Sequence, residues 1–205
     1  ARLPFVLVVN PSLPVHSLKE LLQYAKSNPG KLSYAARTLG AVIHLSGELL
    51  RSEAGLDMTI VPYKQGGPAA LNDVVAGHVP VTFADPSLIQ GLIADGKLRA
   101  LGVSSLKRMP SLPDIPTLDE AGLRGFEAES WHMAVAPAKT PKAIVDRLHA
   151  EIKSIVAQPA VNERMLKLGL VPVDSPPVEE LRKYMRTENA RWGNIIRKAG
   201  IAGSM

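Results

Sequence analysis

Four pieces of sequence decide the fold of this chain, namely Gly96–Val103 (GKLRALGV), Pro113–Gly122 (PDIPTLDEAG), Trp131 and Ala134–Pro141 (AVAPAKTP). Val61–Lys64 (VPYK) precedes them. The first segment is a β-rich apolar run behind a Gly–Lys turn, whereas the second is a Pro-rich connection with little periodicity. Each segment alone is common in proteins. Their order and spacing over nearly the whole chain form a specific signal.

Apolar runs with β-propensity alternate with helical stretches along the first half of the chain. We predict strands at 5–9, 32–36, 58–61, 79–83 and 98–103. We predict helices that begin at the capping box Ser17–Glu20 and that span 40–51, 68–76 and 88–94. This alternation is typical of an α/β protein in which a parallel-type sheet is layered with helices.

The last third of the chain is mainly helical after one further strand near 131–136. Thr140 is predicted to cap a helix at 141–157, with Pro141 at its first position. The remaining predictions are a short helix from Pro159, a strand at 170–173 and a long helix at 178–198.

Composition excludes several classes of function. The 205 residues are 46% apolar and 21% charged and contain no cysteine, so disulfides, thiolate metal sites and a cysteine nucleophile are excluded. The net charge of +5 is spread along the chain, without a basic tract that alternates with aromatic residues, and no nucleic-acid partner is predicted. No apolar run reaches about 18 residues, the length that a membrane span needs.

A first candidate ligand site is the turn that joins the strand at 32–36 to the next helix. Backbone N–H groups at a helix N-terminus are unpaired, and the helix dipole favours an anion there. A glycine in such a turn lets the backbone approach a ligand closely. We assign to this site Arg37, Thr38, Gly40, Ala41 and His44. The alternative is an ordinary turn that starts a helix.

Two further strand ends carry polar residues. Tyr63 follows the strand at 58–61, and Asp85 and Ser87 follow the strand at 79–83. Ligands of open α/β sheets bind outside the carboxyl ends of the strands, where Asp85 could accept and Ser87 donate a hydrogen bond. The alternative is that Tyr63 is a surface residue and that Asp85 and Ser87 are turn and cap residues.

The sequence contains no motif for catalysis, a metal or a cofactor. His44 and Glu48 are four residues apart on one helix, but two ligands without a third do not make a metal site. A phosphate-binding loop, a nucleophile elbow and a His-Glu-x-x-His motif are all absent from the sequence. We therefore predict no cofactor, no metal and no enzymatic activity.

The ordered series of segments resembles the solute receptors of tripartite tricarboxylate transporters, the Bug or TctC-like family. The resemblance covers residues 3 to 201 and implies a periplasmic-binding-protein fold of type II, with two α/β lobes around a cleft. It also implies an exported, periplasmic receptor that captures a small carboxylated solute and hands it to membrane permease subunits. Closure of the lobes around the ligand is the mechanism expected for such a receptor.

The chain departs from the family pattern at the first candidate site. The resembled family usually has a Ser/Ala-Ser-x-Gly-x-Gly-Ser run there, before x-x-His-Leu. This chain has Ala36, Arg37, Thr38, Gly40 and Ala41 and keeps His44 and Leu45. One glycine and two hydroxyl residues are thus replaced, although Thr38 keeps a hydroxyl and Arg37 could supply a positive charge. Family members also usually have glycine where this chain has Gln65.

The resemblance also implies how the chain divides. Residues 9–127 would form lobe two, which is complete, whereas 1–8 and 128–205 would be the hinge strands and the C-terminal part of lobe one. The N-terminal part of lobe one, and a signal peptide, would precede Ala1. The helices at 141–157 and 178–198 would then expose apolar faces, so we expect either a homodimer or a rearranged C-terminal region.

One alternative class shares this broad fold, namely the effector-binding domain of a LysR-type transcription regulator. The residues that favour the receptor are 62–64, 116–118, Trp131 and 136–137. Trp131 itself is interpreted as a core or hinge residue.

Overall fold

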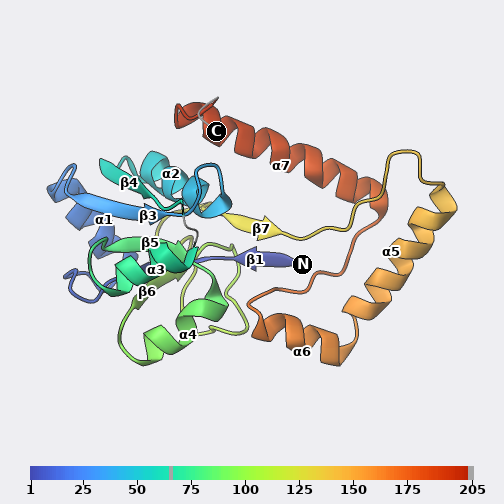
Figure 1. Cartoon of the computed structure of the whole chain (residues 1–205), viewed down its shortest axis with the longest axis horizontal. Helices are drawn as coiled ribbons and strands as arrows, with labels where there is room; N and C mark the ends of the chain where they lie inside the picture. Colours follow the sequence, from blue (N-terminus) through green and yellow to red (C-terminus); the bar gives the residue numbers. More distant parts are fainter. Residues whose placement is uncertain (65–66, 203–205) are drawn as a thin grey trace.

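The computed structural model describes residues 1–64 and 67–202 of the chain (Figure 1). Its strands are β1 (Arg2–Pro4), β2 (Val6–Val9), β3 (Leu32–Ala36), β4 (Met58–Pro62), β5 (Val81–Ala84), β6 (Arg99–Val103) and β7 (Glu129–Trp131). Its helices are α1 (Leu18–Ser27), α2 (Val42–Ala54), α3 (Gly67–Val75), α4 (Pro86–Ala94), α5 (Lys142–Val156), α6 (Pro159–Lys167) and α7 (Val178–Lys198). Within these residues, no helix is both long and apolar enough to cross a bilayer. Gln65 and Gly66, which the sequence places before a helix, lie outside the described residues.

The larger sheet has five strands in the order β4-β3-β5-β2-β6. β3 pairs in parallel with β4 and with β5, as the alternation of strands and helices predicts. The predicted parallel-type arrangement is confirmed for β3, β4 and β5, whereas β2 runs antiparallel to both β5 and β6, so the sheet is mixed. The α/β alternation governs strands that a crossover helix joins, but the neighbours of β2 lie far along the chain from it.

β2 is the buried centre of this unit. Val6 and Val8 point into one apolar cluster and Leu7 and Val9 into the other, and none of the four is accessible to solvent. Alternate residues of a strand face opposite sides of the sheet, so a strand that is apolar at every position needs cover on both. Helices α1 and α2 cover one face and α3 and α4 the other, which gives three layers.

A second, two-stranded sheet leads out of this unit. β1 and β7 pair antiparallel, and Ser104 ties their inner ends to the larger sheet. The Ser104 hydroxyl accepts a hydrogen bond from the Phe5 N–H at 2.9 Å and donates one to the Ala128 carbonyl at 2.5 Å. The strand predicted near 131–136 is misplaced, because β7 spans Glu129–Trp131 and shares only Trp131 with that range. The strand predicted at 170–173 is only a single bridge between Val171 and Arg2.

The C-terminal helices lie beyond this ribbon (Figure 1). α5 begins one residue later than predicted, with Pro141 rather than Thr140 at its N-cap position and no side-chain cap. Its apolar stripe is open to solvent, with exposed fractions of 41–51% for Ile144, Leu148, Ile152 and Ile155.

α7 returns to the larger sheet and runs beside α2 (Figure 1). The expectation that this helix exposes its apolar face is wrong for Trp192 and Ile195, which pack against the core cluster under α2. The Trp192 indole N–H donates to Glu188 at 3.0 Å, and Arg191 donates to the backbone carbonyl of Glu127. The first of these bonds lies within α7, and the second joins α7 to the segment that leads into β7.

Candidate functional site

The candidate site lies at one edge of the five-stranded sheet, where β3, β4 and β5 end. These strands are parallel, so the residues that follow them come to the same edge. Arg37 follows β3, Tyr63 follows β4 and Asp85 follows β5. Three segments that are distant in sequence thus present polar side chains together, at the edge where open α/β sheets bind ligands.

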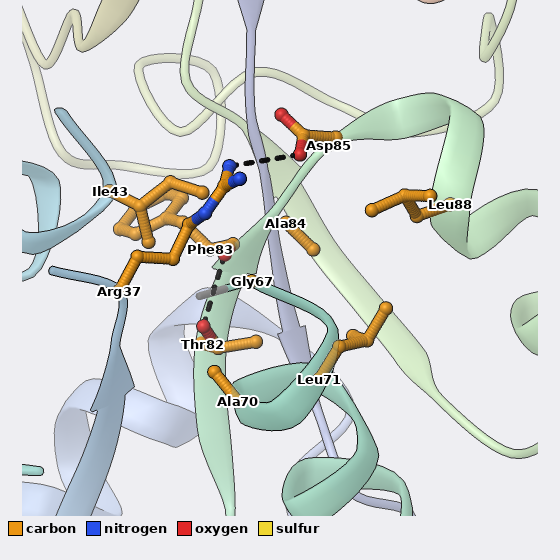
Figure 2. Close-up of a pocket in the computed structure, with 10 residues that line it drawn as sticks. All are labelled: Arg37, Ile43, Gly67, Ala70, Leu71, Thr82, Phe83, Ala84, Asp85 and Leu88. Carbon is orange, nitrogen blue, oxygen red and sulfur yellow. Dashed lines mark hydrogen bonds and ion pairs between the residues drawn. The ribbon is translucent and has the colours of Figure 1, made fainter. Parts of the chain in front are cut away.

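An ion pair joins two of these residues. The Arg37 Nη1 lies 3.1 Å from the Asp85 Oδ2, and Figure 2 shows the guanidinium reaching across the end of β5 toward the carboxylate. Their side chains are 37% and 19% exposed, so both remain accessible to a ligand. The sequence offered both residues as site candidates but did not indicate that they would pair.

Gly67 makes room for the Arg37 side chain. A Cβ atom at Gly67 would stand 2.7 Å from the Arg37 Nε and 2.9 Å from its Cζ, far inside van der Waals contact. The guanidinium therefore lies over the start of α3, in space that any side chain at position 67 would fill.

Three helices begin at this edge, each directly after one of the parallel strands or the short turn that follows it. They are α2, α3 and α4, which start at Val42, Gly67 and Pro86. The Ala41 and Asp85 residues that precede α2 and α4 make no side-chain cap hydrogen bond to their helices. The N–H groups and dipoles of these helix ends favour an anion.

A hollow of about 170 Å³ opens between this edge and the β1–β7 ribbon. Its walls include Arg37, Ala41 and Asp85 from the predicted site. Sequence reasoning missed the other wall residues, which are Leu3, Phe5, Val42, Ile43, Ser130 and His132. Ser130 lies in β7 and His132 directly follows it, so the alternation of an extended chain places both on one side. Trp131 faces the other side, where its ring packs edge-on against Tyr184 at 6.0 Å.

His44 lies beneath the site and not in its wall. It is 2% exposed, and its Nδ1 accepts a hydrogen bond from the Gly40 N–H at 3.0 Å. Burial lowers the pKa of the His44 imidazole, which keeps it neutral and suited to this acceptor role. Gly40 has a φ of 81°, a conformation that glycine adopts without strain, so His44 fixes a turn that needs this glycine.

Tyr63 turns its hydroxyl away from the hollow. The hydroxyl donates to the Asp73 Oδ2 on α3 at 2.6 Å, and burial together with this bond raises the pKa of Tyr63 to about 12. Thr38 and Ser87 are exposed beside the hollow. Among the described residues, neither they nor Gly40, His44 and Tyr63 line it. No group of three His, Asp or Glu side chains within the described residues could hold a metal ion.

The five-stranded α/β unit and the ribbon that leaves it define a periplasmic-binding-protein fold of type II. The same architecture occurs in Rpa4515 of R. palustris, whose structure with adipate has 34% sequence identity, a TM-score of 0.84 and coverage of 98% of this chain and 66% of that one. The periplasmic binding protein BugD has 35% identity, a TM-score of 0.79 and coverage of 98% and 67%.

The chain belongs to the tripartite tricarboxylate transporter family of receptors, whose family model matches residues 1–201. It is 41% identical over 197 residues to the UPF0065 protein in the tcbD–tcbE intergenic region of Pseudomonas sp. strain P51, covering 96% of this chain and 58% of that protein. The chain thus spans less than two thirds of the length of this relative. Membership of this family favours the receptor over the LysR-type regulator.

Proposed function

We propose that the full-length protein is an extracytoplasmic receptor that captures a small carboxylate in a cleft between two lobes. The observation that carries the proposal is Arg37 standing among three helix N-termini at the carboxyl ends of parallel strands. This arrangement suits one carboxylate group, because cationic and N–H donors converge on it. The adipate in the Rpa4515 structure supports a carboxylate ligand.

The residues of the predicted site divide into two groups in this proposal. Arg37, Ala41 and Asp85 would face the ligand, since they line the hollow. His44 and Gly40 would hold the turn in shape, and Tyr63 would brace α3 through Asp73. Thr38 and Ser87 would reach the ligand only at the rim, since both side chains are exposed.

Residues 9–127 would form lobe two, and 1–8 with 128–205 would be the hinge strands and part of lobe one. Two separate sheets support this division, although β2 lies in the five-stranded sheet, which moves the proposed boundary of lobe two to about residue 5. The β1–β7 ribbon would then be the hinge about which the lobes close on the ligand.

Membership of the family supports a proposal for the partners and the location of the protein. The receptor would deliver its ligand to the membrane permease subunits of a tripartite tricarboxylate-type transporter, in the periplasm. We expect a signal peptide in the segment before Ala1 of the full-length protein. The receptor would carry out no chemical step on its ligand.

Ligand binding should appear as thermal stabilisation of the full-length protein. A carboxylate at 100 times its Kd is expected to add about 2.7 kcal/mol to the free energy of unfolding. The screen would compare mono-, di- and tricarboxylates with uncharged amides of the same carbon skeletons. Equal shifts from acids and amides, or no shift from any acid in a folded protein, would contradict the proposal.

We also propose that the isolated 205-residue chain forms a homodimer through the stripe of Ile144, Leu148, Ile152 and Ile155 on α5. A second copy offers the same exposed apolar stripe, and burying the two together removes both from water. Light scattering should give twice the chain mass. Leu148→Glu should yield the monomer, whereas Ala150→Glu, which adds the same charge on the opposite helix face, should not. A monomeric unmodified chain would refute this.

A further inference from the structure

The charges at the mouth of the hollow cancel each other. Arg37 and Asp85 form an ion pair at 3.1 Å, so together they contribute no net charge. Asp85 also stands at the N-cap position of α4, where its carboxylate offsets the positive end of that helix. A ligand with several carboxylates therefore meets little excess positive charge at this edge.

Arg37 nevertheless keeps donors for one anion. A guanidinium carries five N–H groups, and the contact with Asp85 is made through Nη1. The contact with Asp85 and the space that Gly67 leaves place the side chain over the start of α3. The donors that Asp85 does not use can bind one planar carboxylate.

The walls next to this ion pair are mostly apolar. Leu3, Phe5, Val42 and Ile43 line the hollow together with the two charged residues, and its remaining walls are Ala41, Ser130 and His132. Phe5 and Ile43 are each 3% exposed, so the fold holds them in place. A hydrocarbon body can lie against the apolar part of these walls.

We propose that Arg37 sets the ligand class of this receptor as a small monocarboxylate with an apolar body. Asp85 acts as its positioning residue and disfavours a second carboxylate through repulsion. This inference rests on the proposed receptor function and narrows it.

The test uses matched acids that differ by one carboxylate, with calorimetry on the full-length protein. The pairs are hexanoate with adipate and benzoate with isophthalate. We expect each monoacid to bind about tenfold or more tightly than its diacid. Asp85→Asn should shrink this preference about tenfold by strengthening diacid binding. Arg37→Gln should weaken monoacid binding about tenfold or more.

Two glycine variants test the placement of Arg37 without removing its charge. Gly67→Ala should weaken monoacid binding, as Arg37→Gln does, because the new methyl group displaces the Arg37 guanidinium. Gly91→Ala on α4, where a Cβ meets nothing within 4 Å, should leave binding unchanged.

Each negative result of these binding experiments would contradict a different claim. Diacids that bind the unmodified protein as tightly as their monoacids would overturn this inference while leaving the carboxylate receptor standing. An unchanged preference in Asp85→Asn would overturn the role of Asp85. If no acid bound to a protein that circular dichroism shows to be folded, the proposed function itself would fail.

Discussion

Replacing Glu129 with Gln is expected to raise the free energy of unfolding by up to about 3 kcal/mol at pH 8, and to change it little at pH 4. Glu129 is 8% exposed in β7, and burial raises the pKa of its carboxyl to about 7, although Arg2 at 3.5 Å opposes the shift. In the unfolded chain the pKa is near 4.5. Between pH 4.5 and about pH 7, Glu129 keeps a proton in the folded chain that it has lost in the unfolded chain. The free energy of unfolding therefore falls as the pH rises through this range.

Urea denaturation at several pH values between 4 and 8 would measure this effect. The difference between the unmodified protein and Glu129→Gln isolates the group, because all other titrations are common to both. The m-values should agree, which shows that the substitution does not alter the extent of unfolding. Two stability curves that stay parallel across the whole range would disprove the linkage.

Replacing Gly47 with Ala is expected to lower the free energy of unfolding by about 1–3 kcal/mol. A Cβ at this position would lie 2.5 Å from the Cε1 of Tyr34, which is fully buried. The ring cannot move aside easily, since its hydroxyl donates to the Ile43 carbonyl at 2.5 Å. The sign of this change is informative, because replacing glycine with alanine inside a helix otherwise raises the free energy of unfolding by about 1 kcal/mol.

Gly91→Ala provides the matched control for this prediction. Gly91 also lies inside a helix, but a Cβ there meets nothing within 4 Å, so this substitution should stabilise. Chemical denaturation of both variants gives the comparison. If Gly47→Ala stabilised as Gly91→Ala does, the close contact with Tyr34 would be refuted.

Most of the helices and strands could be predicted from the sequence. β3 and α7 have the predicted bounds of 32–36 and 178–198, because their apolar periodicity is uninterrupted and their ends carry clear breakers. The direction of β2 was not predictable, since nothing in Val6–Val9 specifies whether β5 and β6 will run with or against it. Val171 likewise forms only one bridge, because its partner Arg2 belongs to a strand of three residues.

Residues of the candidate site could be predicted from the sequence only where they follow the ends of strands. The parallel-strand rule brought Arg37 and Asp85 to one edge, but no pattern in the sequence shows that Gly67 accommodates the Arg37 side chain. Tyr63 and His44 were attractive candidates by residue type. Their hydrogen bonds to Asp73 and Gly40 arise from tertiary placement, which local spacing does not reveal.

The position of β2 has a consequence for the order of events during synthesis. Val6–Val9 leaves the ribosome well before β5 and β6, yet these are the two strands on which it pairs. Until Ala84 has emerged, this stretch, apolar at every position, has neither neighbour, and until Val103 has emerged it lacks β6. Such segments associate readily with other chains. Formation of the native sheet must await long-range contacts, which slows folding. The strand order of the sheet thus delays the burial of β2 until most of the five-stranded sheet has been synthesised.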